Sequence, residues 1–263
     1  MTRRLRFLPI LCLTAWLAEP ERLQAQEDQE KERPTWNVVV PMVVNVRGIG
    51  DVEWRTELGL RNDTAGEVDV ALTLSGVAGQ PFFFTTLASG ESLTFADPIA
   101  ETFGLVRAMS PLLITTAGAR SVTVTASIVG YAGAQRLRPQ PLSPIFGPAY
   151  STLRSLGGLE VSDSVRTNIG LVNYGETPAS FSLAVQRIVD RNVATSTLIV
   201  PAQSVLQLPL QGLFPLIGEG SGLTVVVDAS SNTTFCYASM LNNETQQPRL
   251  VLPAPINARP FGN

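Results

Sequence analysis

Histidine is absent from this sequence of 263 residues, and lysine occurs only once. Without histidine, the chain has no Ser–His–Asp or Cys–His arrangement and no imidazole ligand for a metal. The single lysine, Lys31, lies in a charged stretch near the amino terminus, which argues against a lysine base or a Schiff base. We therefore expect a protein that is not an enzyme and that holds no metal or cofactor.

Cysteine is also scarce, with two residues in the whole chain. Cys12 falls in the amino-terminal apolar stretch, so Cys236 is left alone in the run TFCYASML. One thiol makes neither an internal disulfide nor a thiolate zinc site, so stability must come from burial. We expect Cys236 to be a small buried hydrophobe, with pairing between two chains as the alternative.

Paired carboxylates are the one catalytic arrangement that the composition leaves open, as in glycoside hydrolases. The candidates are Asp51, Glu53, Glu57 and Asp97. They lie in expected turns or on the exposed side of alternating segments. Solvated surface carboxylates are therefore the favoured interpretation.

No apolar run is long enough to cross a bilayer, which takes about 20 residues. The apolar stretch from Phe7 to Ala18 is shorter, follows three arginines and precedes a small residue, Ala25. This pattern is typical of a secretory signal over residues 1–25, with an uncut anchor as the alternative. We expect a secreted or periplasmic, that is extracytoplasmic, protein without a membrane span in the mature chain.

The charge is low and slightly acidic. Residues 1–25 carry four of the 19 basic and two of the 22 acidic side chains, which leaves 15 and 20, a net charge of −5. Nucleic-acid binding calls for concentrated lysine and arginine, so we expect no nucleic acid as a partner. The next ten residues, QEDQEKERPT at 26–35, lack apolar side chains and predict a disordered leader.

One phrase occurs twice, as WRTELGLRND at 54–63 and as VRTNIGLVNY at 165–174. Its arginine, threonine, glycine and asparagine recur 111 residues apart, and the register continues downstream, with Ser127 and Ser239 separated by 112. A spacing kept over such a length predicts a duplicated domain. It far exceeds the 20–50 residues of solenoid repeats, so each copy can bury its own core.

Within each copy, apolar residues alternate with polar ones. The segments EVDVALTLSG, ARSVTVTASIVGY and ASFSLAVQRIV each place apolar side chains on one face, and turn residues separate them. This period of two is typical of half-buried antiparallel strands. We expect an all-β fold with two tandem immunoglobulin-like antiparallel β-sandwich domains of seven or eight short strands each.

Each copy also carries one short helical signal. In ADPIAETFG, Asp97 is the expected cap, Pro98 the first helical residue and Gly104 the stop. The segment LQGLFPLIG holds the matching place in the second copy. We expect a short helical turn in each domain, with Phe103 and Phe214 closing one end of each core.

Prolines mark the connection between the copies. Four of them, Pro139, Pro141, Pro144 and Pro148, exclude a central strand and favour an extended linker, although Leu142 and Ile145 could pack on a sheet edge. The expected boundaries are a signal at 1–25, a leader at 26–35, sandwich domains at 36–148 and 149–257, and a flexible tail at 258–263.

Three residues, Phe83, Arg55 and Arg166, are the candidates for a binding surface. In GQPFFFTT, Phe83 points away from the face that Phe82 and Phe84 share, so it packs under a loop or against the second copy, or it is exposed for a sugar or partner protein. Arg55 and Arg166 bond neighbouring loops or form a paired anion site.

Glycine and asparagine in the repeated phrase have backbone roles. Gly59 and Gly170 indicate close backbone approach or a bulge. Asn62 and Asn173 indicate tight turns in which the side chain bonds its own chain.

Three phrases resemble a family of uncharacterised secreted bacterial proteins with tandem β-sandwich domains. They are NVVVPMVVNVRGIGDVEWRTELGLRND, SVRTNIGLVNYGETPASFSLAV and CYASMLNNETQQP, and together they extend the resemblance over nearly the whole mature chain. The resemblance implies a secreted or surface-exposed pair of sandwiches. It implies no reaction.

Three functions fit these observations. The first is a secreted, non-catalytic module for adhesion-like binding or scaffolding through sheet edges and loops, with an unknown protein or a surface glycan as partner and possible homo-oligomers. The second is a carbohydrate-binding accessory protein that uses Phe83. The third is a periplasmic chaperone, which requires an open strand edge at a cleft between the domains with cationic anchors. Fold alone does not separate them.

Overall fold

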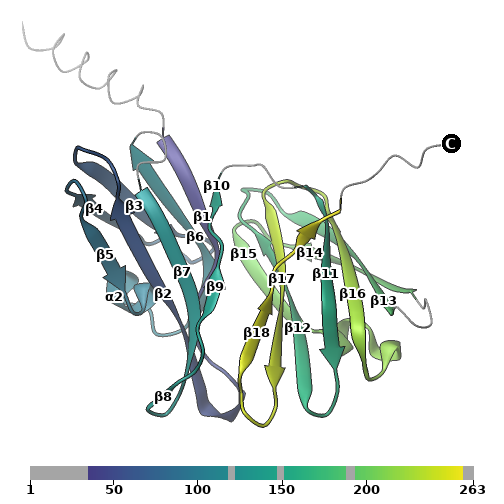
Figure 1. The fold of residues 1–263 in the computed structure, drawn as a ribbon. Coiled ribbons are helices and arrows are strands. Elements are labelled where there is room, and N and C mark those ends of the chain that lie inside the picture. Colours follow the sequence, from purple (N-terminus) through teal and green to yellow (C-terminus); the bar gives the residue numbers. More distant parts are fainter. Residues whose placement is uncertain (1–34, 118–121, 147–150, 188–192, 257–263) are drawn as a thin grey trace, which may run out of the picture.

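The computed structural model describes residues 35–117, 122–146, 151–187 and 193–256. In this part the protein is all-β, and every strand pairing is antiparallel, as the sequence predicts (Figure 1). The expected signal at 1–25, almost all of the expected leader, and the expected tail at 258–263 lie outside the described residues. So do residues 147–150, where the sequence predicts the domain boundary.

The strands before residue 147 form one curled sheet in the order β4-β3-β6-β1-β2-β7-β8, with β10 beside β1, β5 beside β2 and β9 beside β7. The elements are β1 (Thr35–Arg47), η1 (Ile49–Asp51), β2 (Val52–Asn62), β3 (Val68–Leu74), β4 (Phe82–Leu87), β5 (Ser92–Phe95), α2 (Pro98–Phe103), β6 (Ala108–Ala117), β7 (Val122–Ala132), β8 (Gln135–Arg136), β9 (Gln140–Leu142) and β10 (Ile145–Phe146). We call residues 35–146 the first half.

The strands after residue 150 form two sheets, in the orders β14-β13-β16-β11-β19 and β15-β12-β17-β18. The elements are β11 (Leu153–Val161), β12 (Val165–Asn173), β13 (Ala179–Arg187), β14 (Val193–Val200), β15 (Ser204–Pro209), α3 (Leu210–Leu213), η2 (Pro215–Ile217), β16 (Gly220–Ala229), β17 (Thr234–Asn242), β18 (Pro248–Val251) and β19 (Ala254–Pro255). We call residues 151–256 the second half; it lies beside the first (Figure 1).

The single sheet of the first half departs from a simple sandwich of two separate sheets. Strand β1 pairs with β6 along most of its length, but its last residues, Asn45 to Arg47, also pair with Glu53 to Arg55 of β2. A bulge between Val40 and Val43 interrupts the ladder with β6. Bulges bend a strand, so β1 continues from one layer into the next and joins them.

The expected alternation is confirmed in both halves. Alternate residues are buried along β3, β7 and β13. These residues are Val68, Val70, Leu72 and Leu74; Val122, Val124, Ala126 and Ile128; and Phe181, Leu183 and Val185. They belong to two hydrophobic cores, one mainly from the first half and one from the second.

The expected helix start and stop are also confirmed. Asp97 Oδ1 accepts a hydrogen bond from the Ala100 amide, Pro98 is the first residue of α2, and Gly104 ends it in the left-handed conformation, with φ of 65°. In the second half α3 is shorter and begins after Pro209, without a side-chain cap. Phe103 is half-buried against the first core, and Phe214 is buried in the second.

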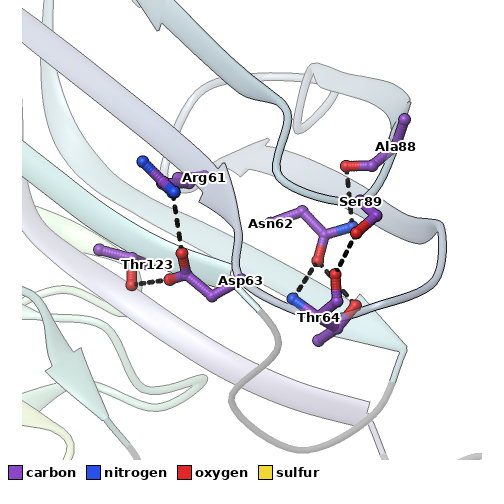
Figure 2. A network of polar contacts seen from close by, with 7 residues as sticks. All are labelled: Arg61, Asn62, Asp63, Thr64, Ala88, Ser89 and Thr123. Carbon is purple, nitrogen blue, oxygen red and sulfur yellow. Dashed lines mark hydrogen bonds and ion pairs between the residues drawn. The ribbon is translucent and has the colours of Figure 1, made fainter.

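Asn62 and Asn173 hold equivalent turns in the two halves, and both are fully buried. The Nδ2 group of Asn62 donates to the carbonyls of Gly66 and Leu87. It also donates to the Ala88 carbonyl, and its Oδ1 accepts from the Thr64 amide (Figure 2). One such side chain ties together two turns of the sheet. The expected bonding to its own chain is therefore confirmed.

Asn173 repeats this pattern. It donates to the carbonyls of Thr177, Val200 and Pro201 and accepts from the Gly175 amide. In both halves the backbone amide that donates to Oδ1 lies two residues after the asparagine, and the first carbonyl that accepts from Nδ2 lies four residues after it. The two halves therefore build the same turn from the same residue.

The proline segment stays with the first half as far as Phe146. Leu142 in β9 and Ile145 in β10 are buried, and the two short strands pair with β7 and β1. The edge packing that the sequence leaves open for Leu142 and Ile145 is confirmed. The chain is consequently fixed along the first half almost up to the point where the second half begins.

Candidate functional site

The two halves pack face to face. Val172, Phe235 and Tyr237 of the second half belong to the hydrophobic core of the first, and Val205 and Leu250 pack against it. The face of β1 and β6 that points away from its own core thus meets the outer face of the sheet that contains β12 and β17. Strand β1 is consequently covered on both sides, since Val39 and Val44 are buried as well as Val40 and Val43.

Polar contacts fix the alignment of the halves. Gln80 Nε2 donates to Gln203 Oε1 at 2.7 Å, and the Leu250 amide donates to Gln140 Oε1 at 2.9 Å. At Gly76, with φ of 69°, a Cβ atom would overlap the Gln203 carbonyl. Glycine is therefore required where the two backbones approach.

A pocket of about 430 Å³ lies at one end of this interface. Both halves contribute to its wall. The lining residues are Met42, Val44, Val46, Arg47, Gly48, Trp54, Met109, Ile128 and Gln140 from the first half, and Arg166, Asn168, Gln207, Tyr237, Ser239, Leu241, Pro248, Arg249 and Leu250 from the second. Its size and its mainly apolar wall are typical of a small-molecule site.

Two aromatic side chains of the wall lie on glycines. A Cβ atom at Gly48 would lie 2.5 Å from Trp54 Nε1, and one at Gly130 would lie 2.8 Å from Trp54 Cζ3. A Cβ atom at Gly170 would overlap the ring of Tyr237. These glycines leave the space that the rings occupy, so the group that lies close to Gly170 is a side chain and not the backbone.

Arg166 provides a positioned cation in the wall. Its Nη1 donates to Asn243 Oδ1 at 3.1 Å and its Nη2 donates to Gln246 Oε1 at 2.9 Å, both in the turn between β17 and β18. Partial burial lowers the pKa of Arg166 from its ordinary value. Guanidinium nevertheless keeps its proton in proteins, and neutral amide oxygens do not cancel its charge.

Neutral polar groups lie beside this cation. Asn168 of β12 and Ser239 of β17 are cross-strand partners, and the structure shows no hydrogen bond from either side chain to another described residue. Tyr237 O–H donates to Gln207 Oε1 at 2.6 Å, and complete burial raises the pKa of Tyr237, so the hydroxyl stays neutral. The pocket therefore offers an amide and a hydroxyl that a ligand can engage.

The pocket is positive although the chain is acidic. Among the described residues that line it there are three arginines and no aspartate or glutamate. Arg47 is paired with Asp51 at 2.9 Å, whereas Arg166 and Arg249 have no carboxylate partner in the described residues. Charge in the pocket thus favours an anion over a cation.

Two other hollows differ in charge and position. One of about 280 Å³ lies at the other end of the interface and contains Glu176, with Asn37 and Tyr174 among its walls. The other is a groove of about 470 Å³ over Gly59 and Thr125 on the outer face of the first half. Neither has an arginine in its lining.

The sequence-predicted arginines have separate places. Arg55 pairs with Glu53 at 2.6 Å and lies over the ring of Tyr131, 5.5 Å from its centre. Arg166 lines the pocket and Arg55 does not. Arg166 bonds a neighbouring turn, whereas Arg55 forms its ion pair within its own strand, and of the two only Arg166 lines the pocket.

Phe83 lies on the inner side of β4. It is half-buried against the first core and makes an edge-to-face contact with Phe95, with the ring centres 5.9 Å apart. Phe82 and Phe84 are the exposed rings, at 74% and 58% exposure. Any aromatic surface on this strand is therefore formed by Phe82 and Phe84 and not by Phe83.

Cys236 is a free thiol inside the second core. Burial raises the pKa of Cys236 to about 11, so little thiolate forms near neutral pH. The position supports the expectation of a small buried hydrophobe. It leaves no access for a bond to a second chain without opening the core.

The sequence patterns did not identify Trp54, Tyr237 and Ser239 as pocket residues. A signal was available, because VVVPMVV in β1 and TFCYASML in β17 are continuous apolar runs and do not alternate. Strands that are buried on both faces have this pattern. The two runs therefore mark the strands that meet across the interface.

Chemically, the described residues around the pocket offer a guanidinium cation, neutral hydrogen-bonding groups and apolar surface. No group of three or more His, Cys, Asp or Glu side chains in the described residues lies close enough together to hold a metal ion. Nor does the described part of the chain contain a helix with the length and apolar character needed to cross a bilayer.

Comparisons with known proteins add nothing to the geometry of the site. No family model, curated protein or solved structure matches the chain.

Proposed function

We propose that this chain is an exported, non-catalytic binding protein that holds its ligand in the pocket between its two halves. The observation that supports this most is the convergence of Arg166, Asn168 and Ser239 in an otherwise apolar hollow. Apolar walls with a few convergent polar groups are the usual form of a ligand site. The missing histidine and the basic, apolar amino terminus support the non-catalytic and extracytoplasmic parts of the proposal.

The proposal includes a duplicated origin, with two immunoglobulin-like sandwich domains at 36–148 and 149–257. Its support is the 111-residue register and the shared hydrogen bonding of Asn62 and Asn173. Membership of the family of secreted bacterial proteins named above belongs to the same proposal. In this view the ligand site arose where the two copies face each other.

Native mass spectrometry and ligand extraction test the binding function. The protein is purified from the exported fraction of the organism that makes it, and released small molecules are compared between wild type and Ser239→Trp. Ser239 lines the pocket, so an indole there fills it. We expect a bound molecule with wild type that Ser239→Trp lacks.

Identical extracts from both proteins would contradict the proposed function, provided that the two proteins unfold at similar temperatures. Arg61→Gln serves as the matched control, because Arg61 is exposed and pairs with Asp63 away from the pocket. It should release the same molecule as wild type.

A second candidate function is glycan binding at the outer edge of the first half. Phe82 and Phe84 are exposed on β4, which ends the ten-stranded sheet. A glycan array compares wild type with Phe82→Ala/Phe84→Ala and with Ile199→Ala, whose side chain is exposed on β14 at the edge of another sheet. Signal lost only in the double variant supports glycan binding, and no signal with wild type rejects it.

The chaperone hypothesis has less support. Strand β18 is the edge of its sheet, but it lies against β9, and its Leu250 amide already donates to Gln140. A peptide strand would have to displace this contact. Arg166 supplies the cationic anchor that the hypothesis requires, and the edge itself is partly covered.

A further inference from the structure

We infer that the pocket between the halves takes a small amphipathic carboxylate, with the carboxylate at Arg166 and an apolar body against the opposite wall. The inference rests on the proposed binding function and adds the chemical class of the ligand. It is carried by the charge of the lining, by the polar groups left without partners and by the shape of the apolar wall.

The head-group site is built around the guanidinium of Arg166. Guanidinium has five N–H donors in a fixed plane, and two are used by Asn243 and Gln246. The remaining donors match the two oxygens of a carboxylate, which guanidinium binds side by side. The two amides hold the guanidinium in place without neutralising it, so it is preorganised for an anion.

Asn168 and Ser239 complete the polar part of the pocket. They come from neighbouring strands in register with each other, and no hydrogen bond joins either side chain to another described residue. Both can donate to an anion, Asn168 through its amide and Ser239 through its hydroxyl. Burying an anion requires such partners, since an unpaired charge in an apolar pocket is strongly disfavoured.

The rest of the wall selects an apolar body. Met42, Val44 and Met109 of the first half and Leu241 and Leu250 of the second line the same hollow, next to the rings of Trp54 and Tyr237. A sugar would leave its hydroxyls unpaired against this surface. Methionine side chains adapt to irregular apolar shapes, so the wall suits a flexible chain or a ring.

The charge of the ligand follows from the absence of carboxylates in the described lining. Arg47 is paired with Asp51, but Arg166 and Arg249 have no carboxylate partner in the described residues, so a cationic amphiphile is repelled and a neutral one gains nothing from Arg166. The volume of about 430 Å³ limits the ligand to a small molecule. The guanidinium of Arg166, with the neutral Asn168 and Ser239 beside it, favours a ligand with a single negative charge.

Isothermal titration calorimetry with three matched probes tests this class. Sodium decanoate, decan-1-ol and decyltrimethylammonium share one apolar chain and differ in head-group charge; each is used below its aggregation limit. We expect decanoate to bind with one site per chain, decanol at least tenfold more weakly, and decyltrimethylammonium not measurably.

Two variants locate the binding. Arg166→Gln should weaken decanoate by about 10- to 100-fold, because a hydrogen bond to a charged group is worth about 1.5–3 kcal/mol, and should leave decanol nearly unchanged. Ser239→Trp should abolish the binding of both decanoate and decanol. Arg61→Gln, at an exposed position, should change the affinity for neither probe. Thermal unfolding of every variant checks that the fold is kept.

Each failure has a distinct meaning. If decanoate does not bind, or binds Arg166→Gln as well as wild type, the carboxylate inference is wrong. If decanol binds and decanoate does not, and Ser239→Trp abolishes the decanol binding, the proposed binding function is supported and only the carboxylate inference is wrong. If no probe binds, and Ser239→Trp releases the same molecules as wild type on extraction, both are overturned.

Discussion

Two strand pairs in this molecule occupy equivalent places and meet different surroundings. In β2–β7, Gly59 lies opposite Thr125; in β12–β17, Gly170 lies opposite Tyr237. Thr125 is exposed beside an open groove, whereas Tyr237 is fully buried against the other half. One side chain opposite a glycine thus distinguishes a face that meets solvent from one that meets protein.

The neighbouring residues repeat this difference. On β7 the outward residues Thr123 and Thr125 are polar and exposed, but on β17 both faces are buried, from Phe235 to Ala238. Burial of apolar area drives association, and a threonine face contributes little of it. The equivalent face of the first half is therefore not suited to receive another domain in the same way.

The largest expected effect comes from making β17 resemble β7. Tyr237→Thr should lower the free energy of unfolding by about 4 kcal/mol, because it removes a fully buried aromatic ring from the interface. Urea unfolding measures this, and Thr125→Val on the exposed face is the control, expected within about 0.5 kcal/mol of wild type. A loss under 1 kcal/mol for Tyr237→Thr would mean that the interface contributes little to stability.

The two asparagines test whether the halves depend equally on the turn they share. Asn62→Ala and Asn173→Ala each leave three carbonyls without their Nδ2 donor, and we expect each to cost about 3 kcal/mol. Urea unfolding again provides the measurement. Losses that differ by more than about 1.5 kcal/mol would show that the two turns contribute unequally to the free energy of unfolding.

Sequence patterns predicted the parts of the fold that depend on local order. Alternation identified the inner faces of β3, β7 and β13, and capping residues located α2. For the run Phe82–Phe84 no local pattern decides which face is inner. Pairing of Phe83 with the buried Leu72 decides it, and that pairing joins separate strands.

The continuous apolar runs indicate which strands meet, but no local pattern identifies the wall of the pocket. Alternation shows which side chains share a face but does not identify what covers that face. Arg166 was recognised because the repeated phrase contains it, whereas Trp54 in the first phrase is matched by Val165 in the second. Only the contact between the two halves brings Trp54 and Tyr237 into one wall.

Substitution of Gly170 and of Gly59 should give smaller losses of stability, which differ between the two positions. Gly170→Ala should cost about 2 kcal/mol, since the new methyl group overlaps the buried Tyr237 ring, which has no room to move. Gly59→Ala should cost less than about 1 kcal/mol, because the exposed Thr125 hydroxyl, 2.5 Å from the added Cβ, can rotate away. Thermal unfolding of both variants measures the difference, and equal losses would contradict this account of Gly170.

The smallest expected effect concerns pH. Leu60 lies opposite Val124 in β2–β7, and Leu171 lies opposite Cys236 in β12–β17, so only the second position titrates. Burial raises the pKa of Cys236 from 9.0 to about 11 in the folded protein, so the unfolded chain loses this proton first. Stability from this group is complete below pH 9 and falls as pH rises towards 11.

At pH 10 the loss should be about 1 kcal/mol relative to pH 8. Cys236→Val, which copies Val124, should lack this component in urea unfolding at the two pH values. If wild type and Cys236→Val change equally between pH 8 and pH 10, the thiol does not contribute.

The burial of strand β1 on both faces determines what is exposed when the two halves separate. Val39 and Val44 are covered by the second half, while Val40 and Val43 belong to the first core. Separating the halves would uncover a continuous apolar strip along a strand that remains folded. A fragment that ends near Phe146 should therefore self-associate in solution. The intact chain should unfold in a single cooperative transition.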